Sequence, residues 1–445
     1  MKRTRLQALL LAFALVAAAC GDDDDDGGTT DTTEAADATT TSAGGGAGTT
    51  AAPDGTGTTA TTAAGGEEGS GGAAGGFDID AVLAADLSSC EPAPTGEPLK
   101  LGFAADLSDL GGFADLPASQ AAEHVVDLIN CTGGVNGTPL ELTVQNIEGD
   151  PEVTQRAAQD LVDAGVHAIL GPPFADFGQP LLQVTQGQIP VLFVASTEPT
   201  LPDVASLAYL VAFDDTAQAT AAAEFALDQG WQNAVTFSAP GPYFGYNPQV
   251  FTEVYEAGGG TVLGDYNFVP IDDVDFSTQV NEIANLETPP DVVYTAMLAF
   301  QAAPLAEQLA AAGVETNFLI TDAFEATGGY ATDGTEGFYH TTHSFPEEGS
   351  RVALLDESFE EATGAPLENP SFGGLAADAI AVVIDAHLRS GSTDPAVIGA
   401  AIAEGSGIEG VTGVLSYDGG ATPTKPVYVH QVVDGAPTLA ATIGG

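Results

Sequence analysis

Positive charge is what this 445-residue chain lacks most, because it has 8 Lys and Arg residues against 63 Asp and Glu residues. Three of the basic residues, Lys2, Arg3 and Arg5, lie at the extreme N-terminus. Residues 21–445 keep 5 basic and 63 acidic side chains, which give them a formal charge of −58. A field of this sign repels nucleic acid and anionic membrane surfaces, so nucleic acid is not an expected partner.

Catalytic motifs are also missing from the sequence. It contains no G-x-S-x-G nucleophile elbow and no P-loop. His340 and His343 are three residues apart, but no cysteine or paired carboxylate accompanies them at metal-ligand spacing. We therefore expect a protein that is not an enzyme and that has no metal ion or other cofactor.

The N-terminal residues MKRTRLQALLLAFALVAAAC have the layout of an export signal. A basic start precedes an apolar run over residues 6–19, which is shorter than the roughly 20 residues that a stable membrane anchor needs. Residues 1–20 resemble a bacterial lipoprotein signal peptide, although Ala17 stands where such sites usually have leucine. This resemblance implies that Cys20 is lipidated and becomes the new N-terminus. An ordinary cleaved secretory signal is the alternative.

Residues 21–76 consist almost entirely of Gly, Thr, Ala and Asp and include no aromatic residue. Such a segment cannot bury enough apolar surface to offset its ordering entropy, so we expect a disordered tether. We find no second apolar run of membrane-spanning length after Cys20, which leaves the lipid as the only expected membrane anchor. The folded part would then work outside the cytoplasmic membrane, attached to it.

Cysteine is scarce, with three residues in the whole chain. If Cys20 carries lipid, Cys90 and Cys131 remain as a pair. Export removes the protein from the reducing cytosol, so we predict a disulfide between them. Two separate buried thiols are the alternative.

From Leu99 onward, strand patterns alternate with helix patterns. KLGFAAD predicts a strand and ASQAAEHVVDLIN a helix, and the same rhythm restarts after Asp214-Asp215. Repeated strand–helix units predict mostly parallel sheets that helices cover on both faces. Near the C-terminus, VTGVLSYDGG and KPVYVHQVVDG predict two strands joined by a Gly-rich turn.

The order of these segments resembles that of the bacterial leucine/isoleucine/valine-binding proteins, which are type I periplasmic binding proteins of ABC importers. The matching segments, in the family's order, are DLINCTGGVNGTPLELTVQNIEGDP, LVDAGVHAILGPP, IPVLFVAST, YFGYN, DVDFSTQVNEI, PPDVVYTA and IEGVTGVLSYD. The resemblance spans residues 99–435. It implies an α/β fold of two Rossmann-like lobes with mostly parallel sheets, joined by a three-segment hinge, within residues 77–445.

The same resemblance implies boundaries and partners. The crossings between lobes fall near 212–214, 339–342 and 412–420. Lobe one covers about 97–212 and 342–412, and lobe two about 214–340 and 413–445. The ligand of such a protein binds between the lobes at the carboxyl ends of the strands, and closure signals occupancy to the ABC permease. We expect a monomer.

In lobe one, the loop 106–113 offers Phe113 to a ligand, with a plain solvent loop as the alternative. The loop GPPFADFG, with Phe174, lies where the family holds the ligand carboxylate through backbone N–H groups and a hydroxyl. Ala175 stands at the hydroxyl position, so that hydroxyl is missing. The segment Ala195-Ser196-Thr197 matches the family's ligand-bonding carbonyl and hydroxyl, with strand-end capping as the alternative.

In lobe two, Tyr243 or Phe244 matches an aromatic residue that covers the ligand, and Met297 falls near a second one. Asp322 occupies the place of the ammonium-binding carboxylate, or else caps the following turn. Asp322 and Thr197 indicate an amine-bearing ligand. The departures at Ala175 and Met297 indicate that it is not a standard branched-chain amino acid, and they leave amides, urea-like compounds and aromatic acids open.

The sequence therefore predicts an extracytoplasmic solute-binding lipoprotein that captures an amino-acid-like small molecule and delivers it to an ABC importer. A ligand-sensing lipoprotein of the same fold, paired with a separate receptor, is the alternative.

Overall fold

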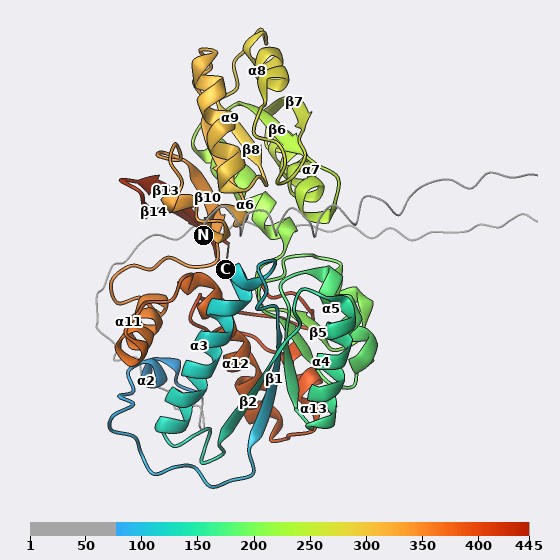
Figure 1. The fold of residues 1–445 in the computed structure, drawn as a ribbon, viewed down its shortest axis with the longest axis vertical. Coiled ribbons are helices and arrows are strands. Elements are labelled where there is room, and N and C mark those ends of the chain that lie inside the picture. Colours follow the sequence, from blue (N-terminus) through green and yellow to red (C-terminus); the bar gives the residue numbers. More distant parts are fainter. Residues whose placement is uncertain (1–76, 445) are drawn as a thin grey trace, which may run out of the picture. The chain divides into compact units, whose positions relative to one another are not determined.

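The computed structural model describes residues 77–444. The predicted signal peptide, the lipidation of Cys20 and the tether fall in residues 1–76 and so lie outside the described residues. Within residues 77–444 the chain forms one five-stranded sheet, one seven-stranded sheet and one two-stranded sheet (Figure 1). This is the mixed α/β, mostly parallel architecture that the sequence predicted.

The first large sheet has the strand order β2-β1-β3-β4-β5, and all its strands are parallel. Its strands are β1 (Leu99–Ala105), β2 (Leu140–Asn146), β3 (Ala168–Gly171), β4 (Val191–Phe193) and β5 (Ala208–Leu210). Successive residues of β1 face opposite sides, so Phe103 joins one hydrophobic cluster and Ala104 the other. β3 and β4 are buried along their whole length because helices cover both faces.

Helices of the first sheet lie in two groups. α4 and α5 share the hydrophobic cluster of one face, and α3 and α12 share that of the other. The helices are α2 (Ile79–Leu83), α3 (Gly112–Cys131), α4 (Pro151–Asp163), α5 (Ala175–Thr185), α11 (Arg351–Thr363), α12 (Pro370–Ser390) and α13 (Pro395–Ala403), with a 3₁₀ turn at η2 (Leu201–Val204).

Helix α3 begins earlier than the sequence indicated. The apolar residues at helical spacing in ASQAAEHVVDLIN predict a helix that starts at Ala118. The helix instead begins at Gly112 and includes Pro117. Phe113 therefore lies in the first turn of a helix and not in a loop.

The second large sheet has the order β14-β13-β10-β9-β8-β6-β7. Five strands are parallel, and β13 and β14 run antiparallel at one edge. The strands are β6 (Asn233–Ser238), β7 (Thr261–Asn267), β8 (Val292–Thr295), β9 (Asn317–Ile320), β10 (Tyr339–Thr342), β13 (Val427–Val433) and β14 (Ala436–Ile443). The associated helices are α6 (Asp215–Asp228), α7 (Pro242–Ala257), α8 (Ser277–Ala284), α9 (Ala299–Ala311) and α10 (Ala323–Ala326), with a 3₁₀ turn at η3 (Gly329–Ala331).

The C-terminal strand pairing corrects the sequence prediction. β13 pairs with β14 across Asp434-Gly435, whose φ angles of 55° and 72° suit a tight hairpin turn. The segment VTGVLSYDGG instead supplies β12 (Val414–Leu415), which pairs with β11 (Ile408–Glu409) in the two-stranded sheet. The hairpin of β13 is therefore formed through the Asp434-Gly435 turn that follows this strand, and not through the Gly-rich stretch that precedes it.

Helix α12 is long and apolar enough to cross a membrane by length and composition, although no such run was recognised after Cys20 in the sequence. Within the described residues, 83% of its most apolar 18-residue window is buried. Its side chains belong to the hydrophobic cluster that covers one face of the first sheet. Burial in this core accounts for its composition.

The disulfide between Cys90 and Cys131 is present in the structure. Cys90 lies in the segment before β1, and Cys131 is the last residue of α3. The bond closes 41 residues of chain within the part that carries the first sheet.

The chain passes between the two large sheets three times: after β5, after β10 and after β12. Residues 339–342, where the family resemblance placed the second crossing, form β10 itself, so the passage follows at 343–350. The exact lobe limits stay a prediction.

A buried polar cluster joins the first and third of these passages to α12. Lys425 Nζ lies 2.5 Å from Thr412 Oγ1, 3.4 Å from Asp378 Oδ2 and 3.5 Å from the carbonyl oxygen of Val211. Asp378 on α12 also accepts hydrogen bonds from the backbone N–H groups of Val411 and Thr412. We call Lys425, Asp378, Thr412 and the carbonyl of Val211 the crossing cluster.

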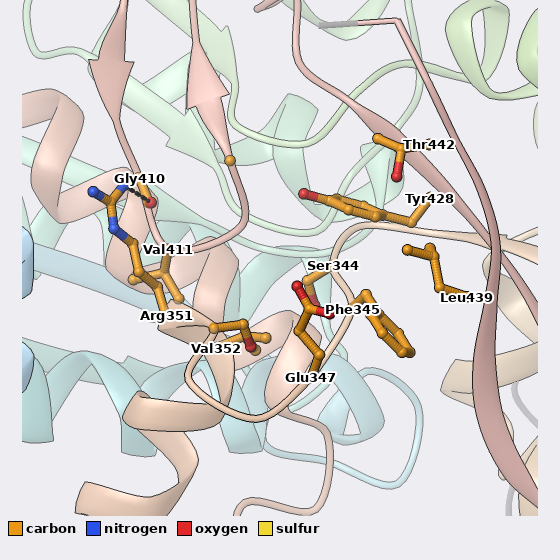
Figure 2. A pocket seen from close by; sticks show the side chains of 12 residues that line it. Ser344, Phe345, Glu347, Arg351, Val352, Gly410, Val411, Tyr428, Leu439 and Thr442 are labelled. Atoms are coloured by element: carbon orange, nitrogen blue, oxygen red, sulfur yellow. Dashed lines mark hydrogen bonds between the residues drawn. The ribbon is translucent and has the colours of Figure 1, made fainter.

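Close to this cluster lies a cavity of about 310 Å³, which is lined by the second passage, the turn between β11 and β12, and strands β13 and β14 (Figure 2). Arg351 lines it and donates a hydrogen bond to the carbonyl oxygen of Gly410 at 3.0 Å, while ion pairs with Asp80 and Glu409 hold the guanidinium. None of the ligand-binding residues predicted from the sequence lines this cavity.

Candidate ligand-binding site

Asp322 lies two residues after the carboxyl end of β9 and is almost fully buried. Its side chain makes no capping hydrogen bond to α10. Asp322 Oδ1 instead lies 2.5 Å from the hydroxyl of Tyr243, and Oδ2 lies 3.1 Å from Nε2 of His343. We call Asp322, Tyr243 and His343 the site cluster.

Charge in the site cluster resides on Asp322. Burial raises the pKa of Asp322, but hydrogen bonds from His343 and Tyr243 outweigh it and hold that pKa below its ordinary value. Burial lowers the pKa of His343 more than Asp322 raises it. A neutral His343 therefore donates its Nε2–H to an ionised Asp322, and its Nδ1 becomes an acceptor that has no hydrogen-bond partner.

Gln218 on α6 fixes the backbone of Asp322. Its Oε1 accepts hydrogen bonds from the backbone N–H of Asp322 at 2.8 Å and from the hydroxyl of Thr341 at 2.7 Å. These bonds join α6, β9 and β10 at one point. The position of the Asp322 carboxylate is thus set by three separate elements.

Asp215, the first residue of α6, is a second acid that sequence analysis did not select, and it is only 1% exposed. Its backbone N–H donates to the carbonyl oxygen of Thr197 at 2.9 Å. Burial, followed by the charge of Asp322, raises the pKa of Asp215 well above its ordinary value. The doubled acid Asp214-Asp215 was the available signal, since one aspartate suffices to cap a helix.

A third acid, Glu325 on α10, connects to the first sheet's helices. Its carboxyl group accepts hydrogen bonds from the hydroxyls of Thr342 and Ser371, the latter at 3.1 Å. Burial raises the pKa of Glu325, although these hydrogen bonds lower it. Ser371 lies in the first turn of α12, so this contact joins the two parts of the chain.

Aromatic rings from three helices meet beside these acids. The ring of Phe113 is centred 6.0 Å from that of Phe174 and 6.2 Å from that of Phe372. Phe372 in turn lies 6.1 Å from His343, whose ring stacks on Phe213 at 4.1 Å. Phe113 is 37% exposed, so this row of rings offers apolar surface to a molecule bound beside it.

The remaining predicted residues of the first sheet lie at strand ends and helix starts. Ala175 is the first residue of α5, with Phe174 at the N-cap, and Phe174 makes no side-chain capping bond. Ala195, Ser196 and Thr197 follow β4, and only Ala195 of the three is partly exposed. Thr197 meets the second part of the chain through Asp215.

Met297 and Phe244 lie elsewhere. Met297 is completely buried in the hydrophobic cluster of the second sheet, so its side chain does not reach the surface in this structure. Phe244 packs edge-on against Phe268 at 5.9 Å and against Tyr243 at 5.5 Å. The structure thus joins Tyr243 with Asp322, and Phe113 with Phe174, but packs Met297 into the core.

A metal ion has no ready site here. Among residues 77–444, no group of three or more His, Cys, Asp or Glu side chains is arranged to hold one.

Residues 98–437 match the family model described as periplasmic binding protein. The chain belongs to the periplasmic binding protein family. Leu/Ile/Val-binding protein homolog 3 of Brucella melitensis is 25% identical over 326 residues, which cover 72% of this chain and 87% of that relative. The family predicted from the order of sequence segments is therefore confirmed, and the protein is a solute-binding protein by family.

Solved structures agree on the fold of this periplasmic binding protein. A leucine binding protein of Thermotoga maritima superposes with a TM-score of 0.65 at 22% identity, covering 78% of this chain and 98% of that one. A solute binding protein of R. palustris in complex with benzoate gives a TM-score of 0.62 at 18% identity, covering 78% and 96%. Proteins of this one fold thus hold ligands of different chemistry.

Proposed function

We propose that this periplasmic binding protein captures an amine-bearing small molecule between its two sheets and passes it to an ABC importer. The observation that carries the proposal is Asp322, an ionised carboxylate that is almost fully buried at the carboxyl end of β9. A carboxylate offers about four lone-pair sites, and only Tyr243 and His343 donate to it in the hydrogen bonds of the described residues. An ammonium group is the natural occupant of the remaining sites.

Thr197 supplies the contact from the opposite side of the proposed site. It follows β4 of the first sheet, and its carbonyl already reaches Asp215 at the start of α6. A ligand held by Thr197 and Asp322 together would favour approach of the two parts of the chain, as hinge closure requires. The name of the Brucella melitensis relative, a Leu/Ile/Val-binding protein homolog, supports an amino-acid-like ligand.

A thermal-shift screen of amino acids, amines, amides and aromatic acids tests the proposal. A ligand at a hundred times its Kd should stabilise the protein by about 2.7 kcal/mol. The Glu224→Gln variant, which changes an exposed acid on α6, is the matched control and should give the same shift. A complete lack of binders across the screen would contradict a solute-binding role.

Membrane attachment through lipid on Cys20 is part of the same proposal. A Cys20→Ser variant should be released into the medium, because the apolar run before it is too short to remain as an anchor. Wild-type membrane retention by that variant would contradict the lipid anchor. Uptake of the identified ligand in cells with and without the protein then distinguishes an importer component from a sensory one.

A further inference from the structure

Two groups at the proposed site, Asp322 and His343, keep acceptor capacity that no donor of the described residues uses. Asp322 keeps lone pairs free, and the Nδ1 acceptor of His343 has no partner although that side chain is only 1% exposed. A buried acceptor without a donor is energetically costly, so such atoms usually have a hydrogen-bond partner. What the site lacks is a molecule that brings N–H groups.

No Lys or Arg side chain of residues 77–444 forms an ion pair with Asp322, although the charge of Lys425 contributes to the lowered pKa of His343. Residues 77–444 contain five Lys and Arg residues. Three of them are held by acids at other places: Arg351 by Asp80 and Glu409, Arg389 by Asp385, and Lys425 by Asp378. Lys100 lies near the amino end of β1, and Arg156 is exposed on α4.

A carboxylate on the ligand would therefore have to rely on backbone N–H groups. The start of α5 is the place that the family resemblance assigns to it, and there Ala175 supplies no hydroxyl. Asp176 adds a carboxylate to the first turn of the same helix. The N-terminal end of a helix dipole favours negative charge, and the carboxylate of Asp176 already lies there. Asp176 would therefore repel the carboxylate of a ligand bound at the same helix end.

Apolar surface is abundant on the same side. Phe113, Phe174 and Phe372 form a connected group of rings, and Phe113 is partly exposed. Aromatic faces attract both apolar groups and cations. The site thus combines a buried anion and unmatched acceptors with aromatic rings, and no Lys or Arg side chain of residues 77–444 forms an ion pair with that anion.

We infer that the ligand is a cationic amine that carries an aromatic or other apolar body and has no carboxylate. This inference rests on the proposed function and narrows it to one chemical class. Asp322 and His343 accept hydrogen bonds from the N–H groups of the ligand. Phe113 and the rings beside it contact the apolar part of the ligand. Asp176, together with the missing hydroxyl at Ala175, disfavours the carboxylate of an amino acid.

Isothermal titration with matched compounds tests this inference. The first series is phenylethylamine, phenylalanine and 3-phenylpropionate, and the second is isopentylamine, leucine and 4-methylpentanoate. In at least one series the amine should bind with a Kd at least tenfold lower than both carboxylate-bearing partners. If the amine reaches this tenfold preference in neither series, the inference is overturned while a solute-binding role stays intact.

The double variant Ala175→Ser/Asp176→Asn tests the mechanism of discrimination. Restoring the hydroxyl and removing the charge should narrow the preference for amine over amino acid at least fivefold. The control Glu224→Gln removes an exposed charge on α6 and should change that preference by less than twofold. An unchanged preference in the double variant overturns the inference. If none of the six compounds binds, the inference falls, whereas the proposed function falls only if the wider screen also finds no binder.

Discussion

The crossing cluster around Lys425 and the site cluster around Asp322 are both buried sets of polar side chains, and they differ in how their charges are matched. Lys425 and Asp378 are completely buried, and each has a partner of opposite charge. Asp322 is nearly as buried, but its closest partners are a hydroxyl and a neutral imidazole. One cluster carries both signs of charge, and the other carries only the negative one.

This difference separates structural from ligand-dependent polar groups. A buried ion pair with its hydrogen bonds satisfied is complete without any further molecule, although removal of one partner is strongly destabilising. A buried anion that neutral donors stabilise is only partly compensated, and it gains most from an added cation. In a chain with so few Lys and Arg residues, placing one of them at the crossings and none at the site is consistent with a cation supplied by the ligand.

The largest expected effect comes from breaking the complete cluster. A Lys425→Met substitution leaves Asp378 buried without its cation, so the free energy of unfolding should fall by about 3–5 kcal/mol. Urea denaturation measures it, with Arg156→Met on exposed α4 as the control that changes stability little. Adding Asp378→Leu to Lys425→Met should recover part of the loss. If Lys425→Met is as stable as wild type, the ion pair with Asp378 does not stabilise the protein, and the contrast between the crossing cluster and the site cluster fails.

A second effect, slightly smaller, lies away from both clusters. Replacing Cys90 and Cys131 by serine removes the bond that closes 41 residues and should lower the free energy of unfolding by about 3–4 kcal/mol. Because neither cysteine touches the site cluster, ligand affinity should stay within twofold of wild type. A loss of affinity equal to that of a site variant would mean that the disulfide shapes the site.

Much of this architecture could be predicted from the sequence. The repeated strand–helix units and the order of family segments were sufficient for the fold, and they placed Asp322 at a strand end. The hydrogen bond between Asp322 and Tyr243 was not predicted. Strand ends are readable because the period-2 and period-3.6 patterns stop there. The start of α3 was not predicted, because the regular apolar spacing was recognised only from Ala118 onward, whereas the helix begins at Gly112. The partner of β13 was not predicted, because the Gly-rich stretch before β13 resembled a hairpin turn and the actual turn to β14 follows β13.

The rest of the site depends on contacts between residues far apart in the chain. His343 is 21 residues from Asp322, and Gln218 is 104 residues away, so no local pattern links them. Asp215 looked like an ordinary helix-start acid until burial distinguished it from Asp214. Met297 was assigned by position in the family, but which side of a strand end a residue faces is decided by packing.

A third buried cluster sharpens the comparison because it contains neutral histidines. The hydroxyl of Tyr330 lies 2.7 Å from His340 Nε2 and 3.0 Å from His430 Nδ1. Burial, followed by the proximity of His340, lowers the pKa of His430 to about 3, whereas histidine in the unfolded chain keeps its ordinary value of 6.5. Between these values the unfolded chain binds the proton and the folded one does not, so stability is lost as pH falls below 6.5.

The measurement compares wild type with a His430→Gln variant by urea denaturation between pH 6.5 and pH 4.5. The stability advantage of wild type should shrink by about 1.4 kcal/mol for each pH unit. Acids with raised pKa values, such as Asp215 and Glu325, titrate with the opposite sign, but they are common to both proteins and cancel in the difference. A difference that does not change with pH would mean that His430 takes up a proton in the folded protein.

The smallest expected effect is a change in the free energy of ligand binding. It decides whether the site cluster depends on a ligand, as the crossing cluster does not. Asp322→Ala should weaken binding of the ligand identified by screening more than tenfold, which is more than about 1.4 kcal/mol, because the ammonium group loses its anion. Asp322→Asn keeps the volume and the acceptor but removes the charge, so it should weaken a cationic ligand nearly as much while the free protein stays folded. Calorimetry measures both variants, with Glu224→Gln as the exposed-acid control. If both variants bind as wild type does, Asp322 serves only to hold Tyr243 and His343, and the site cluster is as self-sufficient as the crossing cluster.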